Sequence, residues 1–326
     1  MGIFTKLNHH QLAKLLSQFE GVPSTNFEAR GVAMGTVNTY YKIHHTTGNL
    51  NFLKIDEVAD RKRLLNELRI LALLTKNQKQ IGYLTPSPIS VKKSKRPFIP
   101  HGKKFALLFP EIPGHAVFDL PPAKMKIVGE AIARLHTLPI GRDIKPHRFN
   151  LAGQDKVFRQ IQGKLADKLP DVFALITAKR RALKTQAPKT ERETLLHADL
   201  FAENIHWESG HLSGILDFEA SGRGNPLFDL GVCLHALCHR NGRFHYPSIK
   251  AFLSGYLSIR KLSVAERKYL GYYLDQSAMR FLLTRLRDFE LVPGTNKAEP
   301  FKDYREFLKR FDENQTLAQK LKTMVI

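Results

Sequence analysis

The sequence predicts an α+β fold, with a small antiparallel sheet in the N-terminal part and a mainly helical C-terminal part. Short strand-like stretches joined by turn signals follow one another up to about residue 55. Beyond about residue 115, apolar residues recur mostly at helical spacing. With 326 residues, the chain is also too long for one small core and suits two packed units.

The N-terminal part begins with an expected helix over residues 8–19, where apolar residues recur at i, i+3, i+4 and i+7. Three antiparallel strands are expected next, around Phe27, over residues 37–44 and over residues 51–55. A Thr-Thr-Gly-Asn turn at residues 46–49 joins the last two. These short connections favour an antiparallel sheet.

A proline-containing break separates the two parts of the chain. A helix over residues 60–75 and a short buried strand over residues 105–109 come before it. The sequence Pro-Glu-Ile-Pro-Gly at residues 110–114 then interrupts the pattern. We therefore assign residues 1–109 to an N-terminal lobe, the break to a hinge, and residues 115–326 to a helical lobe.

Helical periodicity dominates the C-terminal part. One apolar helix face is marked by residues 128–135, and long periodic segments cover residues 248–259, 265–289 and 304–321. The exception is a compact β-rich stretch over residues 195–218. Polar chemistry is therefore expected where a small sheet interrupts the helices.

The composition is typical of a soluble globular protein. Hydrophobic residues make up 43% and charged residues 25% of the chain. No run of about 18 apolar residues could span a membrane, and we expect a cytoplasmic location without membrane association. The two cysteines, Cys233 and Cys238, are expected to be reduced thiols. A zinc site that combines them with His235 and His239 lacks the usual spacing between ligand pairs.

The formal net charge of +21 favours binding of anions. Basic residues are spread along the chain, and are densest in an expected polar loop over residues 92–104 and over residues 179–192. Neither stretch alternates with aromatic residues as a nucleic-acid stacking surface would. We therefore expect a solvated surface that attracts phosphorylated metabolites, and we do not expect a nucleic-acid partner.

The most informative pattern combines two acids and an amide in the β-rich stretch. Asp199 and Asn204 lie five residues apart in an expected loop, and Asp217 ends the returning strand of a hairpin with a Ser-Gly turn. Carboxylate and amide oxygens suit a hard cation such as Mg²⁺. A further carboxylate at Asp199 could orient an accepting hydroxyl and take its proton. These are the parts that phosphoryl transfer requires.

The expected hairpin register brings the amide and the second acid together. Folding about Ser209-Gly210 places Asn204 opposite about Ile215 and Asp217 opposite about Ala202. Diagonal neighbours across two strands lie about 7–8 Å apart. Asn204 and Asp217 can therefore converge on one metal ion.

The N-terminal lobe offers candidate residues for binding a nucleotide. Lys54 lies in an apolar strand, where an ammonium group needs an anionic partner. Glu67, thirteen residues later in the following helix, is the natural carboxylate. Gly31 and Gly35 flank a loop where backbone amides could approach phosphates. The chain has no Gly-x-x-x-x-Gly-Lys-Ser/Thr sequence, so a P-loop kinase is not supported.

Several of these stretches resemble motifs of the aminoglycoside phosphotransferase/choline kinase superfamily, whose members have a protein-kinase-like two-lobed fold. Within it, they are most similar to the homoserine kinases of that fold. The similar stretches are His197-Ala198-Asp199-Leu200-Phe201-x-x-Asn204, Ile215-Leu216-Asp217-Phe218, Phe228-Asp229-Leu230-Gly231-Val232-Cys233-Leu234 and, near the start, Phe4-Thr5 through Gly31-Val32-x-x-Gly35-x-x-Asn38.

The resemblance implies ATP and Mg²⁺ as cofactors and a role for each motif residue. Asp199 would be the catalytic base, while Asn204 and Asp217 would hold the metal. Lys54 would contact the ATP phosphates and pair with Glu67.

The resemblance also implies structural and hinge roles. Residues 111–114, with Glu111 and Ile112, would form the adenine hinge. Asp229 would tie the catalytic loop to the helical lobe, and His197 is expected to pack that loop.

The acceptor is expected to be a small molecule with a hydroxyl group, with L-homoserine as the best candidate. Its carboxylate would need a cation, and Arg148 and Asn150 are candidates because a similar Arg-x-Asn occurs in homoserine kinases. Two departures from that group stand out. Homoserine kinases often lack the strand lysine found here as Lys54, and Glu219 stands where they usually have Tyr. Glu219 is expected to act as an acid beside the metal and substrate or as an ion-pair partner.

Two alternatives remain open from the sequence. The acceptor could be another small alcohol, such as an aminoglycoside, choline, a sugar or an amino sugar. The chain could also be a basic, non-enzymatic, kinase-like binding protein. The presence of Asp199, Asn204 and Asp217 together argues against this second alternative.

Overall fold

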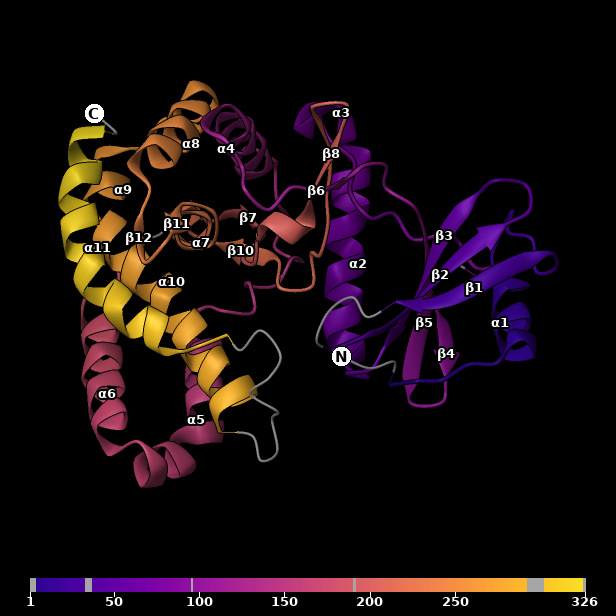
Figure 1. The fold of residues 1–326 in the computed structure, drawn as a ribbon, viewed down its shortest axis with the longest axis horizontal. Helices are drawn as coiled ribbons and strands as arrows, with labels where there is room; N and C mark the ends of the chain where they lie inside the picture. The colour runs from indigo at the N-terminus through magenta and orange to yellow at the C-terminus, as the bar shows by residue number, and fades with distance from the viewer. Residues whose placement is uncertain (1–3, 33–36, 95, 190–191, 292–301, 325–326) are drawn as a thin grey trace.

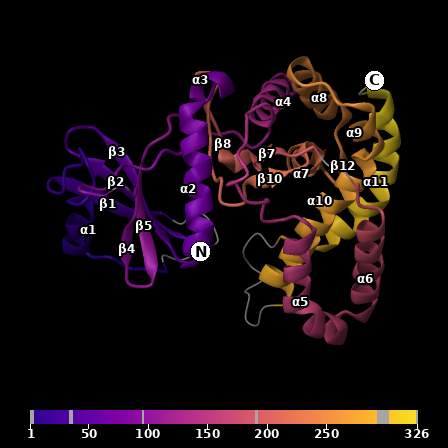
Figure 2. The same cartoon turned by 180° about the vertical axis from the view of Figure 1, so that it is seen from behind.

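The computed structural model describes residues 4–32, 37–94, 96–189, 192–291 and 302–324. A sheet with one short flanking helix forms one side of the molecule, and most of the helices form the other side (Figure 1). The long helix α2 (Arg61–Lys76) stands between them, as the view from behind also shows (Figure 2). The predicted α+β arrangement, with the sheet first and the helices after it, is confirmed.

The N-terminal sheet has five antiparallel strands in the order β1-β2-β3-β5-β4. The strands are β1 (Phe27–Val32), β2 (Thr39–His45), β3 (Leu50–Asp56), β4 (Ile99–His101) and β5 (Lys104–Pro110). Alternate side chains such as Ile43, Leu53 and Ile55 are fully buried in a core that they share with helix α1. This alternation is what a sheet covered on one face requires.

Two N-terminal elements differ from the sequence prediction in extent. Helix α1 (His9–Leu16) begins after Asn8, which forms a capping box with Gln11, and it ends before the predicted Phe19. The predicted basic loop over residues 92–104 contains strand β4, so that expectation was incomplete. Ile99 is buried and pairs with Ala106, and the lysines around this short apolar segment concealed it.

Helix α2 joins the two parts of the molecule through its buried face. Asp60 caps its first turn by accepting hydrogen bonds from the backbone N–H groups of Lys62 and Arg63. Leu64 and Leu71 belong to the large core of the helical part, and Glu67 is the one charged residue of the helix that is buried. Glu67 therefore faces the space between the two parts.

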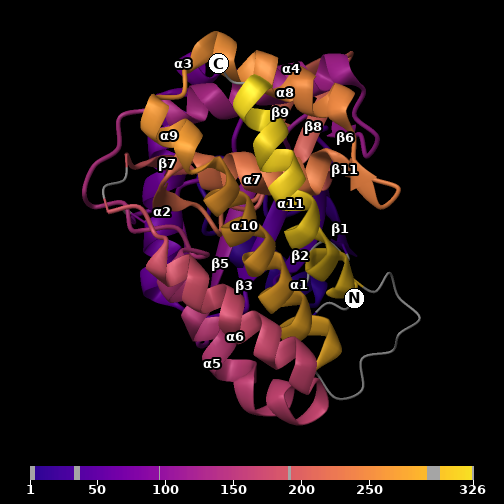
Figure 3. The same cartoon turned by 90° about the vertical axis from the view of Figure 1, so that its left-hand side faces the viewer.

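The C-terminal part is built from helices that pack around α7 and α10. Its helices are α3 (Gln78–Ile81), α4 (Pro122–His136), α5 (Leu151–Lys168), α6 (Pro170–Thr185), α7 (Pro226–Leu237), α8 (Tyr246–Ile259), α9 (Val264–Lys268), α10 (Leu270–Arg285) and α11 (Arg305–Met324). Helix α10 packs against α7, α11 and α5 (Figure 3). The predicted helix over residues 265–289 is divided at Tyr269, where α9 ends, and closes with a π-helical turn over Leu286–Glu290.

Short strands interrupt the helices of the C-terminal part. They are β6 (His115–Ala116), β7 (Thr194–Leu196), β8 (Ile205–Glu208), β9 (His211–Ile215), β10 (Gly222–Gly224), β11 (His239–Arg240) and β12 (Arg243–Phe244). The predicted β8–β9 hairpin is present. Ser209 and Gly210 have φ values of 48° and 83°, as a type I′ turn requires.

The predicted register of this hairpin is wrong by one residue near its open end. Ile205 pairs with Ile215, and the Leu216 N–H donates to the Asn204 carbonyl over 2.8 Å. A β-bulge after His206 inserts one extra residue on the returning strand. Counting from the turn cannot reveal such a bulge, so Asn204 was placed opposite Ile215 instead of Leu216.

Two further expectations can be compared with the structure. Cys233 and Cys238 are free and buried, as predicted for reduced thiols. Within the described ranges, no helix is both long enough and apolar enough to cross a bilayer.

Candidate active site

A cleft of about 460 Å³ lies between the sheet and the helical part, and it is lined by residues from both. This volume suits a small organic ligand. From the N-terminal side it is lined by Lys54 and Glu67, from the connecting segment by Glu111 and Ile112, and from the helical part by Asp199, Asn204, Asp217 and Glu219. Residues from distant parts of the sequence therefore meet around one space.

The loop that carries Asp199 is held in place by Asp229, from the first turn of α7. The Asp229 carboxylate accepts hydrogen bonds of 2.7 Å from the backbone N–H groups of both His197 and Ala198. The His197 ring bonds through Nε2 to the Leu216 carbonyl at 2.9 Å, which ties the loop to the end of the hairpin. Asp229 thus joins the loop to α7, and His197 joins it to the hairpin.

A second buried histidine supports Asp229 from the side of α4. His136 Nε2 lies 3.1 Å from Asp229 Oδ2, and its Nδ1 lies 2.9 Å from the Tyr256 hydroxyl. Burial lowers the pKa of His136, although the neighbouring Asp229 opposes this change. His136 had no assigned role in the sequence prediction, and here it is part of the hydrogen-bond network below the Asp199 loop.

Asn204 and Asp217 lie on the same wall of the cleft as Asp199. The Asn204 amide is 3.4 Å from the Asp199 carbonyl, and the bulged hairpin places Asn204 beside Leu216, next to Asp217. Ala198 and Asp217 have φ values of 66° and 62°. Non-glycine residues adopt this left-handed conformation rarely, and such strain concentrates at functional sites.

Asp217 is a carboxylate without a cationic partner among the described residues. Asp217 is exposed to solvent, but it lies inside a cleft that is lined by both parts of the protein. This enclosure, together with the negative charges of Glu219 and Asp199, raises the pKa of Asp217 to about 7. A divalent cation bound there would remove the unfavourable charge, so the donor set of Asp217 and Asn204 fits Mg²⁺.

Lys54 makes the ion pair with Glu67 that the sequence predicted, with 3.0 Å between Nζ and Oε1. It also pairs with Glu219 at 2.6 Å, and Glu219 in turn contacts Arg63 at 2.9 Å and Asn38 at 2.5 Å. Glu219 therefore forms ion pairs with two cations from the N-terminal part, one of the two roles considered for it.

The pKa values of this charge cluster reflect its strong pairing. Burial opposes the charge on Lys54, but Glu67 and Glu219 outweigh it and raise the Lys54 pKa well above its ordinary value. Burial likewise opposes ionisation of Glu219, but Lys54 and Arg63 lower the Glu219 pKa to about 2. Both groups are therefore charged at neutral pH.

Several other predicted residues lie apart from this centre. Gly31 lies inside β1, paired with Tyr41, and is not among the residues that line the cleft. Gly35 lies outside the described residues. The Asn150 side chain caps α5, accepting from the Gly153 N–H at 2.9 Å and donating to the His147 carbonyl at 2.9 Å, so its amide is already engaged.

Arg148 and Glu111 have exposed side chains. Arg148 lies beside the ring of Phe149, 5.6 Å from its centroid, and makes no ion pair in the described part of the chain. Enclosure and the nearby charge of Arg287 lower its pKa. Glu111 makes a loose pair with Lys42 at 3.7 Å.

One residue at the centre was missed by the sequence analysis. Arg280 on α10 forms an ion pair with Asp199, with 2.6 Å between Arg280 Nη2 and Asp199 Oδ1. The signal in the sequence was an arginine within the apolar run Ala278-Met279-Arg280-Phe281-Leu282-Leu283. A charged side chain inside such a buried helix requires a partner, but the run does not say which one.

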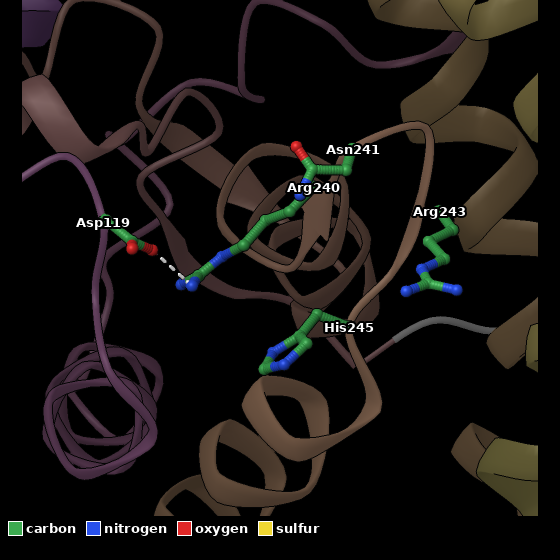
Figure 4. A pocket seen from close by; sticks show the side chains of 5 residues that line it. All are labelled: Asp119, Arg240, Asn241, Arg243 and His245. Carbon is green, nitrogen blue, oxygen red and sulfur yellow. Dashed lines mark ion pairs between the residues drawn. The ribbon is translucent and has the colours of Figure 1, made fainter.

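A second cavity, of about 450 Å³, lies away from this cleft beside the β11–β12 hairpin (Figure 4). It is lined by Asp119, Arg240, Asn241, Arg243 and His245. Arg240 already pairs with Asp119 and donates to the Leu120 carbonyl. Unlike Asp217 in the first cleft, the one acid that lines this cavity, Asp119, is therefore already paired with a cation. No group of three or more His, Cys, Asp or Glu residues that could hold a metal occurs in the part of the chain that the structure describes.

A family comparison agrees with the geometry of the cleft. The model of the phosphotransferase enzyme family matches residues 28–262, which include all the candidate catalytic residues.

Curated relatives are similar along nearly their whole length. A homoserine kinase of Allorhizobium ampelinum is 28% identical over 295 residues, covering 90% of this chain and 90% of the relative. A homoserine kinase of Bradyrhizobium diazoefficiens is 28% identical over 324 residues, covering 98% and 96%.

Solved structures of similar fold come from several kinases. A spectinomycin phosphotransferase in complex with ADP and spectinomycin superposes with a TM-score of 0.69 and 14% identity, covering 98% of this chain and all of that one. A microcompartment-associated aminopropanol kinase gives a TM-score of 0.65 with 18% identity, covering 96% and 97%. At these identities the likeness concerns the fold.

Proposed function

Because the chain belongs to the phosphotransferase enzyme family, we propose that it is an ATP-dependent kinase that phosphorylates the hydroxyl group of a small molecule. The observation that carries this proposal is the meeting of Asp199, Asn204 and Asp217 on one cleft wall, with Lys54 in the same cleft. Phosphoryl transfer depends on positioned cations and on one group that receives a proton.

Asp199 is the proposed catalytic base. Its carboxylate faces the cleft and is half-buried, and the Asp229 hydrogen bonds hold its loop. It would orient the acceptor hydroxyl and take its proton as the oxygen attacks the γ-phosphorus of ATP and ADP leaves. Fixing the loop from below reduces the reorganisation needed during that step.

Asn204 and Asp217 are the proposed magnesium ligands. The raised pKa of Asp217 supports this assignment, because a carboxylate surrounded by negative charge gains most from a cation. When bound, Mg²⁺ would neutralise charge on the phosphate oxygens.

Lys54 is the proposed phosphate contact, and its ion pair with Glu67 holds the lysine side chain in the cleft. Residues 110–114 are proposed as the hinge next to the adenine, since Glu111 and Ile112 line the same cleft. A nucleotide is supported by a fold neighbour that was solved with ADP.

L-homoserine is the proposed acceptor. The support is the full-length similarity to homoserine kinases and Arg148, an arginine that makes no ion pair among the described residues and whose charge interacts with that of Asp199. The carboxylate of an amino acid is the kind of anion that an unpaired guanidinium binds well.

The experiment is ADP release by the purified protein with ATP, Mg²⁺ and candidate acceptors. L-homoserine should give the highest kcat/KM in a panel with L-threonine, choline, methylthioribose, amino sugars and aminoglycosides. Faster turnover of one of the other acceptors would replace homoserine but leave the kinase proposal intact. No acceptor-dependent ADP release with any of them would refute the kinase proposal.

A further inference from the structure

Arg280 is a buried cation in direct contact with the candidate catalytic base. It is 5% exposed, and its Nη2 lies 2.6 Å from Asp199 Oδ1. Its guanidinium carbon lies 3.9 Å from the ring centroid of Phe149 and 4.1 Å from that of Phe281. The two rings hold the flat guanidinium group in a fixed orientation.

The charge of Arg280 is only partly satisfied by the protein. Its Nε atom is buried without a hydrogen-bond partner in the described structure. Burial lowers the Arg280 pKa, and although Asp199 opposes this, the positive charges of Arg148 and Arg285 lower it further. An unpaired buried donor costs free energy, so this arrangement favours a second anion.

Positive charge exceeds negative charge on this side of Asp199. Arg280 and Arg148 are close enough for their positive charges to repel each other, and Arg148 makes no ion pair within the described ranges. The other neighbouring arginines are committed elsewhere, Arg285 to Glu306 at 2.8 Å and Arg287 to Asp288. Asp199 thus pairs with Arg280, while the charge of Arg148 has no ion-pair partner among the described residues.

We propose that Arg280, in addition to Arg148, recognises the carboxylate of the acceptor, and that it thereby restricts the enzyme to small hydroxy acids. This inference rests on the proposed kinase function and deepens it. A guanidinium has five N–H donors, so Arg280 can bind a second carboxylate beside Asp199. An acceptor held this way places its hydroxyl at Asp199 and its acid group at Arg280.

The ion pair between Asp199 and Arg280 has a role in this arrangement. While Asp199 contacts Arg280, one of its oxygens is occupied by the guanidinium. When the acceptor binds, its carboxylate accepts hydrogen bonds from the Arg280 guanidinium. The Asp199 oxygen is then free to accept a hydrogen bond from the acceptor hydroxyl. Alcohols without an acid group do not displace the ion pair, and they are phosphorylated slowly.

The test compares two acceptors that differ only in the acid group. L-homoserine carries the carboxylate, and 3-amino-1-propanol is the same chain with hydrogen in its place. The wild-type protein is expected to prefer L-homoserine in kcat/KM by about 10- to 100-fold, the effect of one charge-assisted contact. In Arg280→Met this preference should fall to within about threefold, with KM for L-homoserine rising most.

A purely positional role for Arg280 predicts a different result. If Arg280 only orients Asp199, Arg280→Met lowers kcat for both acceptors equally and the preference stays as in wild type. That result would overturn the inference. Arg285→Met is the matched control, because it removes an arginine of the same helix whose partner is Glu306, and its preference should equal that of wild type.

Folding and binding are measured on the same variants. Thermal melting and ATP binding show whether each variant is folded, and Arg280→Lys is the second variant if Arg280→Met is not. Lysine keeps the charge but not the planar fork, so an intermediate preference is expected. An unchanged preference in a folded Arg280→Lys protein argues against carboxylate recognition by the guanidinium.

Failure of the inference can be distinguished from failure of the proposed function. If the wild-type protein phosphorylates both acceptors equally well, it is a kinase, but Arg280 does not recognise the carboxylate of the acceptor. If no acceptor is turned over, binding decides. L-homoserine and 4-hydroxybutyrate should raise the melting temperature of wild type but not of Arg280→Met, and 3-amino-1-propanol should shift neither. Equal shifts in both proteins would reject the role of Arg280.

Discussion

The two walls of the cleft neutralise their charges in different ways. Lys54 of the N-terminal wall pairs with Glu67 on the same side and with Glu219 from the helical part, so charges of opposite sign satisfy one another. On the opposite wall, Asp217 has no cationic partner among the described residues, and its pKa rises to about 7. The charges of the first wall are therefore paired within the protein, whereas the second wall is proposed to obtain its missing positive charge from a bound cation.

This difference indicates a division of labour. A matched cluster keeps a long lysine side chain in one orientation, as a phosphate contact requires. An unmatched carboxylate binds a cation strongly because the cation relieves its repulsion from Glu219 and Asp199. Arg280 adds a third case to the comparison, because its positive charge is proposed to bind the carboxylate of the acceptor.

The largest expected effect concerns the base. Asp199→Asn keeps the shape of the side chain but cannot accept the hydroxyl proton, so kcat should fall by about 10²- to 10⁴-fold. ATP affinity, measured by fluorescence or calorimetry, should change little because the nucleotide contacts lie elsewhere. Near-wild-type kcat in this variant would remove Asp199 from the mechanism.

The second prediction tests the unmatched wall. Asp217→Asn removes the charge proposed to attract Mg²⁺, and the magnesium concentration for half-maximal ADP release should rise by more than about tenfold. Glu208→Gln, on the exposed end of β8, is the control and should leave the titration unchanged. A magnesium titration that does not move in Asp217→Asn contradicts the metal assignment.

The third prediction tests the matched wall through stability. Lys54→Met leaves the buried Glu67 without its nearest cation, which should lower the free energy of unfolding by about 3 kcal/mol. KM for ATP should rise as well. Urea denaturation gives the first quantity and steady-state kinetics the second.

A double variant sharpens that comparison. Lys54→Met with Glu67→Gln removes both partners of the pair and should recover part of the lost stability, because no uncompensated charge remains at Glu67. If the double variant is less stable than the sum of the single changes, the two side chains do not stabilise each other as the ion pair implies.

The smallest effect is expected at the exposed edge of the cleft. Glu111→Ala removes a side chain that makes only a loose pair with Lys42 at 3.7 Å. Unfolding free energy should change by less than about 0.5 kcal/mol, and KM for ATP by less than about threefold. A large rise in KM would show that the Glu111 side chain itself binds the nucleotide.

Local sequence patterns were enough to predict the centre of the candidate site. Asp199, Asn204 and Asp217 lie within nineteen residues of one another, and a Ser-Gly turn folds that segment onto itself. Lys54 and Glu67 were also predictable, because a lysine in an apolar strand requires an acid in the adjoining helix. The bulge after His206 was not, since a bulge depends on how the hairpin packs.

Contacts between remote segments depended on how the helices and the sheet pack together. Arg280 meets Asp199 from a helix eighty residues later, and Glu219 reaches Lys54 and Arg63 across the cleft. Periodicity says that such residues are buried or charged, but it does not say which partners they meet. The candidate catalytic segment could be predicted from the sequence because its residues lie close to one another along the chain. The electrostatic surroundings of that segment came from packing, because charges from different elements act through space rather than along the chain.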